Sequence, residues 1–269
     1  FFLIWNAYPQ GMRAKKWLQI AGTVILAFLA LTFRTPEGGY FRAGWWGILG
    51  LIGWAYCFCA VSYLLARRKP LWLMFVWLAL LGVNMLQTGL RDGGSLIEGR
   101  TFIGDMAGAL RLGNASSAIM AMGGVLLSLA ESRLSSRKGA VRICYAFATA
   151  AVLAAAAAVS HHWWIISKNI GTLPWCLYVS SLSVAVYALL RILEAYGRTG
   201  WFRLLSPSGT ATLTVYMMPY LLYSIGGFIG LHTPQWVSGG LGLLKCALFS
   251  LLCVAFTALL GKAGLKLKI

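Results

Sequence analysis

Charged residues are scarce in this sequence, and acidic residues are the scarcest of them. Asp, Glu, Lys and Arg make up 11% of the 269 residues, and only six residues are acidic. Soluble domains are roughly one quarter charged, so this composition excludes an ordinary water-soluble globular protein. So few carboxylates also argue against a carboxylate-driven proton pump and against a metal-dependent membrane hydrolase, and we expect no metal site.

Common catalytic motifs and disulfide patterns are missing as well. The sequence has no Walker loop, no HExxH and no GxSxG motif, which are usual signatures of nucleotide hydrolases, zinc proteases and serine hydrolases. Its six cysteines lie in apolar segments, where thiols act as small apolar fillers; they are Cys57, Cys59, Cys144, Cys176, Cys246 and Cys253. We therefore expect neither a disulfide framework nor a cysteine metal clip.

Apolar residues, in contrast, make up 59% of the chain. A membrane-spanning helix needs about 20 mainly apolar residues, and eight stretches qualify: 17–33, 45–66, 70–88, 113–130, 140–161, 172–193, 210–231 and 236–261. Their hydrophobicity is continuous rather than alternating, which indicates helices. The sequence therefore predicts an all-α polytopic membrane protein with eight complete transmembrane helices in one domain over 1–269. We interpret Phe1 to Tyr8 as the tail of a preceding helix, so that this domain is N-terminally incomplete.

Basic residues dominate the loops and give a formal net charge of +17, from 23 basic and six acidic residues. They occupy alternate loops, which is typical of orientation signals at the cytoplasmic face and not of a nucleic-acid interface. The cytoplasmic set is Arg13, Lys15, Lys16, Arg67, Arg68, Lys69, Arg133, Arg137, Lys138, Arg142, Arg191, Arg198, Arg203, Lys262, Lys266 and Lys268. We therefore expect both ends of the sequence in the cytoplasm. An aromatic belt is expected at the opposite face, formed by Trp45, Trp46, Trp163, Trp164, Trp175 and Trp236.

Polar side chains gather at one end of two predicted helices, between His161 and Trp175. His162 ends the fifth predicted helix on the non-cytoplasmic side, where a neutral imidazole could take a proton from an attacking amine or hydroxyl. Lys168 and Asn169, which we place at the start of the next helix, could hold an oxyanion or substrate hydroxyls. The alternatives are an interfacial histidine that only forms hydrogen bonds, and a snorkelling anchor with a helix cap.

Further amides lie near the same boundary. Asn84 and Gln87 share a helix face at i, i+3, and Asn114 opens the fourth predicted helix. Together with Trp175 of the aromatic belt, Asn84 and Asn114 are candidate substrate-binding residues. Hydrogen bonds between helices explain these amides equally well.

A second polar group lies on the predicted cytoplasmic side. Ser208 and Thr210 open the seventh predicted helix, and Arg198 and Arg203 lie just upstream. A helix N-terminus beside arginines can bind phosphate, although capping and orientation charges explain the same residues. Lys245 lies ten residues into the last predicted helix, about 14 Å deep at 1.5 Å per residue. That depth predicts a buried anionic partner or a polar tunnel.

Three stretches together resemble one known family: Trp45 to Tyr56, Ile166 to Trp175, and Pro207 to Tyr216. They are similar to bacterial relatives of heparan-alpha-glucosaminide N-acetyltransferase, a transmembrane acyltransferase family that includes a domain formerly of unknown function. The resemblance covers essentially the whole chain, and the first stretch is the most specific. It implies that acetyl-CoA is used as a co-substrate from the cytoplasmic side and that the acetyl group reaches an amino sugar on the other side.

The resemblance also implies a key catalytic histidine in an early non-cytoplasmic loop, upstream of Phe1. Neither His161 nor His162 inherits that role, which leaves them beside the acceptor sugar. With the residues above, this predicts an acetyl-CoA-dependent amino-sugar N-acetyltransferase of the bacterial inner membrane. Its acceptor end would contain His162, Lys168, Asn169, Asn84, Asn114 and Trp175, and its acetyl-CoA end Arg198, Arg203, Ser208, Thr210 and Lys245.

Two other functions stay open at this point. A transporter of amino sugars or muropeptide fragments would need broken helices near the midplane, for which Pro219 and the pair Gly226-Gly227 are weak signals. A non-catalytic membrane scaffold would leave Lys245 and the polar cluster without a purpose. The oligomeric state is also open, a homo-oligomer included.

Overall fold

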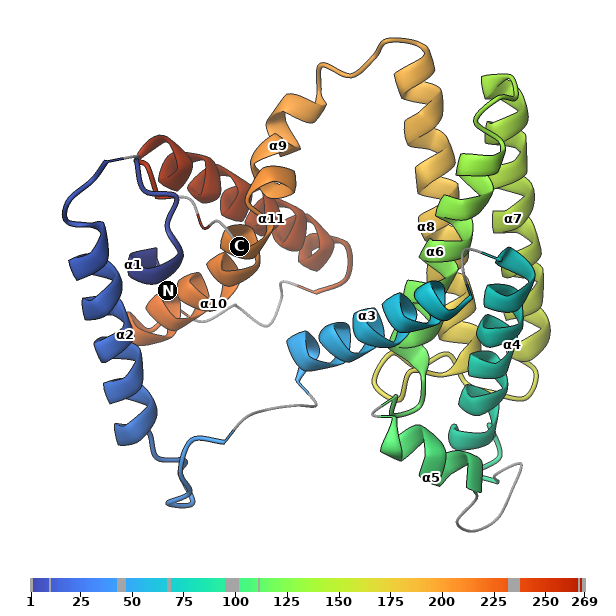
Figure 1. Ribbon diagram of the computed structural model, residues 1–269, viewed down its shortest axis with the longest axis horizontal. Helices are drawn as coiled ribbons and strands as arrows, with labels where there is room; N and C mark the ends of the chain where they lie inside the picture. Colours follow the sequence, from blue (N-terminus) through green and yellow to red (C-terminus); the bar gives the residue numbers. More distant parts are fainter. Residues whose placement is uncertain are drawn as a thin grey trace. The chain divides into compact units, whose positions relative to one another are not determined.

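Helices form nearly all of the regular structure in a computed structural model of the chain, which describes residues 2–9, 11–42, 47–66, 69–94, 102–110, 112–231, 238–265 and 267. Eleven helices follow one another within these residues (Figure 1). They are α1 (Phe2–Trp5), α2 (Lys15–Thr32), α3 (Ile48–Leu65), α4 (Pro70–Gln87), α5 (Phe102–Ala109), α6 (Ser116–Arg133), α7 (Gly139–Ser160), α8 (Leu173–Ala195), α9 (Phe202–Thr210), α10 (Thr212–Phe228) and α11 (Gly239–Lys262).

Prolines and glycines mark where several helices begin and end. Pro70 and Pro174 lie in the first turns of α4 and α8, where the missing N–H has no helical acceptor in any case. Gly197, Gly230 and Gly264 follow α8, α10 and α11, each with a positive φ of 67 to 76°. This left-handed conformation closes a helix at low cost only for glycine.

A helix forms at each of the eight places that the sequence predicts, but the prediction of eight complete spans is not confirmed. Among the described residues six helices are long and apolar enough to cross a membrane, namely α2, α3, α4, α7, α8 and α11, as in a multi-pass membrane protein. In α6, Glu131 and Arg133 at the end of its 18 residues lower the apolarity, and α10 has 17 residues. The charged end of α6 and the short length of α10 are therefore why six helices qualify instead of eight.

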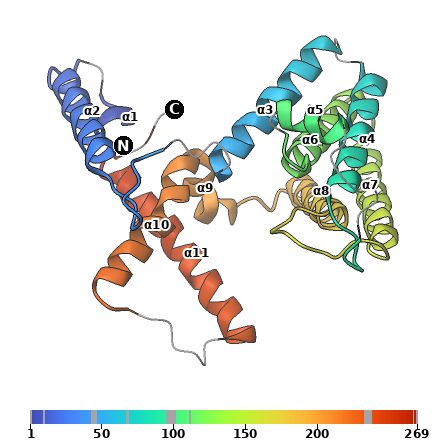
Figure 2. The same cartoon turned by 90° about the horizontal axis from the view of Figure 1, so that it is seen from below.

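The chain divides into two compact units, each described by itself. Unit 1 comprises Phe1–Arg42 and Thr199–Ile269, and unit 2 comprises Ala43–Arg198. Within unit 2, α6 lies against α3 and α4, and α7 lies along α8 (Figures 1 and 2). The prediction of a single domain over 1–269 stays a prediction.

The core of unit 2 forms where α3, α4 and α6 meet. Leu73, Ile119 and Met122 are fully buried there. The Trp77 indole N–H of α4 donates to the Ile119 carbonyl of α6 at 3.1 Å. In hydrocarbon such a hydrogen bond replaces the water that would otherwise satisfy an indole N–H, so it ties α4 to α6 at a fixed register.

Small residues let α7 and α8 approach closely. Ala146, Ala150 and Ala188 are buried between the two helices. The Ser181 hydroxyl of α8 donates to the Ala150 carbonyl of α7 at 2.7 Å. Close approach of small side chains with an occasional interhelical hydrogen bond is how helices associate in lipid.

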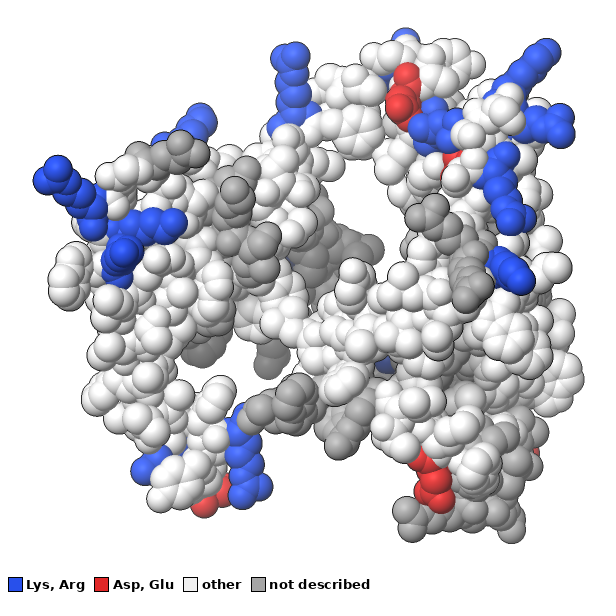
Figure 3. Space-filling view, viewed as in Figure 1, with Lys and Arg blue, Asp and Glu red and all other residues white. Residues whose placement is uncertain are grey.

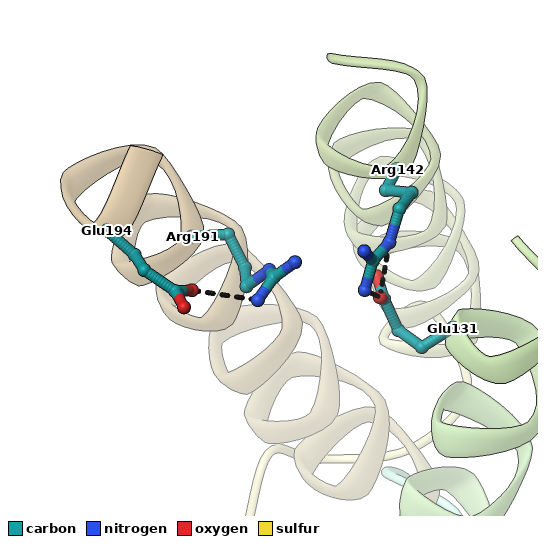
Figure 4. Close-up of polar contacts among 4 residues, drawn as sticks. All are labelled: Glu131, Arg142, Arg191 and Glu194. Atoms are coloured by element: carbon teal, nitrogen blue, oxygen red, sulfur yellow. Dashed lines mark hydrogen bonds and ion pairs between the residues drawn. The ribbon is translucent and has the colours of Figure 1, made fainter. Parts of the chain in front are cut away.

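Ion pairs lie at the end of unit 2 where α6 turns into α7. Arg142 of α7 donates twice to the Glu131 carboxylate of α6, with 2.9 Å from Nε, and Arg191 of α8 pairs with Glu194 at 2.8 Å (Figure 4). Lys and Arg side chains gather toward this end on the face of unit 2 in Figure 3. This is the end that the sequence places in the cytoplasm.

Unit 1 contains α1, α2, α9, α10 and α11. The Gln19 amide of α2 donates to the Ile4 carbonyl of α1 at 3.0 Å. A single residue, Ala211, separates α9 from α10, and its backbone angles (φ −134°, ψ 53°) break the helix. Both helices lie against α11, where Tyr223 of α10 stacks on Phe249 with ring centroids 4.9 Å apart.

The two ion pairs give a testable difference. Glu131→Ala leaves a half-buried guanidinium without its partner from another helix, so the melting temperature in detergent should fall by a few degrees. Glu194→Ala removes an exposed pair within one helix and should change it little. The exchange of Glu131→Arg with Arg142→Glu should restore most of the loss. Equal melting temperatures for both single variants would show that the Glu131–Arg142 pair does not join the helices.

Candidate functional site

A buried amide joins three segments at the end of unit 2 opposite the ion pairs. Asn84 of α4 is fully buried. Its Nδ2 donates to the Asn114 carbonyl, just before α6, at 2.7 Å and to the Gly171 carbonyl, just before α8, at 2.9 Å. We call Asn84, Thr88, Asn114, Gly171 and Thr172 the Asn84 junction. It is the point where α4, the start of α6 and the α7–α8 loop are held together.

The Asn84 amide has one orientation. Two carbonyl acceptors require two N–H donors, so the NH₂ group faces Asn114 and Gly171, and Oδ1 faces the other way. Among the described residues no donor reaches Oδ1, although this atom is buried. A buried acceptor without a donor is costly and is a place where a ligand or a water supplies the missing N–H or O–H.

Asn114 and Gly171 also contact each other directly. Asn114 Nδ2 donates to the Ile170 carbonyl, and its Oδ1 accepts from the Ser116 N–H at 3.2 Å. A Cβ on Gly171 would lie 2.7 Å from Ser116 Oγ, and φ at Gly171 is +57°. Position 171 therefore requires glycine for both the conformation and the close approach.

The α7–α8 loop is closed by its own hydrogen bonds. Thr172 is fully buried; its hydroxyl donates to the Ile165 carbonyl at 2.7 Å and accepts from the Ser167 N–H at 3.1 Å. The Trp164 indole donates to the Thr88 carbonyl at the end of α4, at 3.2 Å. These bonds hold the loop against α4, so the backbone that carries its exposed side chains is held in one position.

His162, Lys168 and Asn169 lie on this loop with exposed side chains. The prediction that Lys168 and Asn169 begin the next helix is wrong, because they lie in a turn and α8 begins at Leu173. Gly171, with its positive φ, separates that turn from the helix. The three side chains thus share one loop above the Asn84 junction, with the amine and the imidazole open to solvent.

The other predicted acceptor residues have different surroundings. Asn114 is half-buried within the junction, and Trp175 packs against the core of α3, α4 and α6. Gln87, one turn from Asn84, is exposed. Trp45, Trp46 and Trp236 of the predicted aromatic belt lie outside the described residues.

The structure corrects part of the predicted acetyl-CoA end. Ser208 and Thr210 do not open a helix, because α9 continues through Thr210 and α10 begins at Thr212. Their hydroxyls donate to the carbonyls of Leu205 and Ser206 in their own helix. Both therefore lie at the carbonyl end of α9, where the helix dipole repels phosphate rather than attracting it.

The three basic residues of that end are all exposed. Arg198 ends unit 2 and Arg203 lies in α9 of unit 1, and each is described only within its own unit. Lys245 is the seventh residue of α11, because that helix begins at Gly239. It lies about 9 Å from the helix start, less than the predicted 14 Å. Its side chain is exposed, and the predicted anionic partner or polar tunnel stays a prediction.

Sequence reasoning gave no role to the hydroxyls and the glycine that build the junction, although Thr172 lies in the predicted polar stretch between His161 and Trp175. Thr88 and Thr172 give no signal by themselves, because an isolated threonine is common at helix ends. Gly171 did carry one, since a glycine just before a Leu-Pro helix start marks a special backbone position. The buried partners of Asn84 depend on tertiary packing and have no local signature.

No protein-family model, curated protein or solved structure matches this chain. The resemblance to the acetyltransferase family therefore rests on the three sequence stretches and remains a prediction.

Asn84 can be tested against its neighbour on the helix. Asn84→Ala removes the donor to the Asn114 carbonyl and leaves the Gly171 carbonyl with longer contacts, from Asn114 Nδ2 at 3.4 Å and the Cys176 thiol at 3.8 Å, so the free energy of unfolding in detergent should fall by about 1–3 kcal/mol. Asn84→Asp should be at least as harmful, since its oxygens would face two carbonyl oxygens. Gln87→Ala changes an exposed side chain and should be neutral within about 0.5 kcal/mol. If Asn84→Ala proves as neutral as Gln87→Ala, the junction does not hold these segments together.

Proposed function

We propose that this protein transfers the acetyl group of cytoplasmic acetyl-CoA to the amine of a glucosamine-type sugar on the periplasmic side of a bacterial inner membrane. In this proposal all eight apolar helices cross the bilayer and the C-terminus is cytoplasmic. At 17 and 18 residues, α10 and α6 are at the short end of the range that spans. Helix α6 contacts α3, α4 and α8, and its charged residues, Glu131 and Arg133, lie in its last turn, where the proposal puts the membrane boundary.

The observation that supports the proposal most is the Asn84 junction with its exposed loop. A helical membrane protein gathers an imidazole, an amine and two amides at one end, beside a buried acceptor, Asn84 Oδ1, that lacks a donor. An amino sugar carries several O–H and N–H donors, which are what such an acceptor requires. Asn84 and Asn114 would then contact the acceptor sugar, and Trp175 would pack beside them.

Acetyl transfer needs a base for the proton of the amine and groups that stabilise the negative charge on the thioester oxygen. The amine nitrogen attacks the thioester carbonyl carbon, a C–N bond forms, the C–S bond breaks, and CoA leaves as the thiol once it gains a proton. In this proposal His162 would take the proton from the amine, and Lys168 and Asn169 would hold the sugar hydroxyls.

The proposed acetyl-CoA site is based on the positive charges of Arg198, Arg203 and Lys245. Arg198 and Arg203 would bind the phosphates, and Lys245 would line the path of the acyl donor. Ser208 and Thr210 would contribute only if their hydroxyls turn from the carbonyls of α9 to the ligand. The arginines are therefore the stronger assignment.

A second candidate function is transport of an amino sugar or muropeptide fragment. The break at Ala211 between α9 and α10, with Pro219 inside α10, favours it. Discontinuous helices are typical of transporter binding sites near the midplane. The two functions differ in whether acetyl-CoA is required.

The enzymatic proposal is tested with the protein in vesicles. Acetyl-CoA and glucosamine are supplied, and free CoA and N-acetylglucosamine are followed over time. We expect CoA release that depends on glucosamine. CoA release that is the same without the sugar, or no CoA release at all, would contradict the proposed acetyltransferase activity.

Variants of the exposed loop test the roles proposed for it. His162→Gln and Lys168→Ala should lower kcat/KM for glucosamine by roughly tenfold to a hundredfold, while leaving KM for acetyl-CoA unchanged. His161→Ala is the matched control, because the His161 ring lies at 3.2 Å from the Trp164 carbonyl of its own loop. Equal effects of all three variants on both substrates would contradict the assignment.

Transport makes the opposite prediction. Vesicles preloaded with unlabelled glucosamine should exchange it for labelled glucosamine without acetyl-CoA. Counterflow under these conditions, together with no CoA release, would establish the transporter in place of the enzyme.

A further inference from the structure

The turn between α6 and α7 of unit 2 is rich in basic side chains. Arg133 ends α6, Arg137 lies in the turn, and Lys138 is the N-cap residue of α7. All three residues are exposed, and among the described residues no carboxylate pairs with any of them. We call Arg133, Arg137 and Lys138 the basic turn. It presents three positive charges that the described part of the chain does not neutralise.

Two other basic residues at this end of unit 2 have acidic partners. Arg142 of α7 donates to Glu131 of α6, and Arg191 of α8 pairs with Glu194 at 2.8 Å (Figure 4). These two pairs use two of the six acidic residues of the chain. The charge of the basic turn is therefore available to a partner from outside the chain.

The length of α7 places the basic turn at a membrane boundary. Helix α7 has 22 residues and is long and apolar enough to cross a membrane. At 1.5 Å per residue it is about 33 Å long, close to the roughly 30 Å of bilayer hydrocarbon. When α7 spans the bilayer, Lys138 at its N-cap lies at the level of the lipid headgroups.

Below the basic turn, one face of α7 is apolar and exposed. Val141, Tyr145 and Val152 are 47%, 43% and 68% exposed, and their spacing puts them on one helix face. The opposite face is buried, since Ala150 packs there against α8. At about 100° per residue, Lys138 lies over the exposed face. Cations and an exposed apolar surface thus follow one another along the same side of α7.

Tyr145 adds a polar group to this face. Its hydroxyl has no hydrogen-bond partner among the described residues. Tyr145 lies seven residues beyond Lys138, about 10 Å deeper, and helical side chains lean toward the helix N-terminus. Its hydroxyl therefore lies between the headgroup level and the hydrocarbon, which is the usual place for a tyrosine in a membrane protein.

A phospholipid has the same groups in the same order: a headgroup phosphate, ester carbonyls and acyl chains. We propose that the basic turn and the exposed face of α7 form a binding site for an anionic phospholipid. The basic turn binds the headgroup phosphate, Tyr145 donates to an ester carbonyl, and an acyl chain lies along Val141 and Val152. The site is independent of the proposed function, because it uses none of the residues assigned to acetyl-CoA or to the amino sugar.

Charge determines the class of lipid. A zwitterionic headgroup carries an ammonium beside its phosphate, and the three cations of the basic turn repel that ammonium. An anionic headgroup has no such cation. Each Lys or Arg near an anionic lipid surface contributes about a fivefold gain in affinity. The basic turn therefore favours an anionic phospholipid over a zwitterionic one with the same acyl chains.

The test is equilibrium binding of a fluorescent phosphatidylglycerol to the full chain in detergent micelles. Unlabelled phosphatidylglycerol should displace the probe at concentrations at least about tenfold lower than phosphatidylcholine with the same acyl chains. Inorganic phosphate at millimolar concentration should not displace it, because it has no acyl chain to bind along α7. Displacement by inorganic phosphate would show a site for the free anion and would overturn the proposal.

Variants of the basic turn test the role of charge. Arg137→Gln and Lys138→Gln should each weaken phosphatidylglycerol binding about fivefold and change phosphatidylcholine binding little. Arg91→Gln is the matched control, because it also removes one exposed cation, but from the other end of unit 2, where the Arg91 N–H donates to the Trp163 carbonyl. It should leave the affinity unchanged.

Tyr145→Phe tests the hydroxyl separately from the charge. Both lipids have ester carbonyls, so this variant should weaken the binding of both by about threefold and leave their ratio unchanged. The control is Tyr56→Phe, which removes the hydroxyl of another exposed tyrosine, 74% exposed in the middle of α3. It should change neither affinity.

Glu131→Gln separates lipid binding from stability. It removes the charge that neutralises Arg142, one turn from Lys138, so phosphatidylglycerol binding should tighten by about fivefold while the melting temperature falls. If this end of unit 2 had only a structural role, the variant would weaken binding and stability together.

Equal displacement by the two phospholipids would overturn the site. So would equal phosphatidylglycerol affinities of the wild type, Arg137→Gln and Lys138→Gln, or an equal loss of affinity in Lys138→Gln and Arg91→Gln. The last result would show a general effect of net charge in place of a site at the basic turn.

Discussion

Two hydrogen bonds from one buried amide hold the polar end of unit 2 together. The fully buried Asn84 amide donates to the carbonyls of Asn114 and Gly171, which come from two other segments of the chain. This fixes the start of α6 and the α7–α8 loop against α4. The loop that carries His162 and Lys168 depends on that arrangement, because Gly171 of the junction and the Trp164–Thr88 hydrogen bond attach it to α4.

Each unit contributes one part of the proposed chemistry. Unit 2 contains the Asn84 junction and the loop on which His162 and Lys168 are exposed, which is the acceptor end of the proposal. In unit 1 Ala211 separates α9 from α10, and α10 continues past Pro219, which lies near its centre between Tyr216 and Tyr220. A membrane protein tolerates such interruptions where a ligand or a neighbouring group completes the hydrogen bonds. Both features are costly in lipid, and under the proposed function a polar substrate would give each of them a partner.

The sequence predicted the helices well, because long apolar runs and their Pro and Gly boundaries are local signals. It failed at helix ends, because the conformation of a single residue there determines where a helix starts or stops. Gly171 keeps Lys168 out of α8, and the continuation of α9 turns Thr210 from the first residue of a helix into the last. Asn84 was identified as a candidate, but its two carbonyl partners, Asn114 and Gly171, are separated from it by 30 and 87 positions in the sequence. Such pairing depends on packing and leaves no pattern in the sequence.

The central claim is that one chain receives acetyl on one face of the membrane and delivers it on the other. The most direct measurement uses sealed vesicles of known orientation, with acetyl-CoA only at the cytoplasmic face and glucosamine only at the opposite face. The account predicts that N-acetylglucosamine accumulates on the side of the sugar while free CoA accumulates on the side of the donor. Product formation only when both substrates share one side would contradict it.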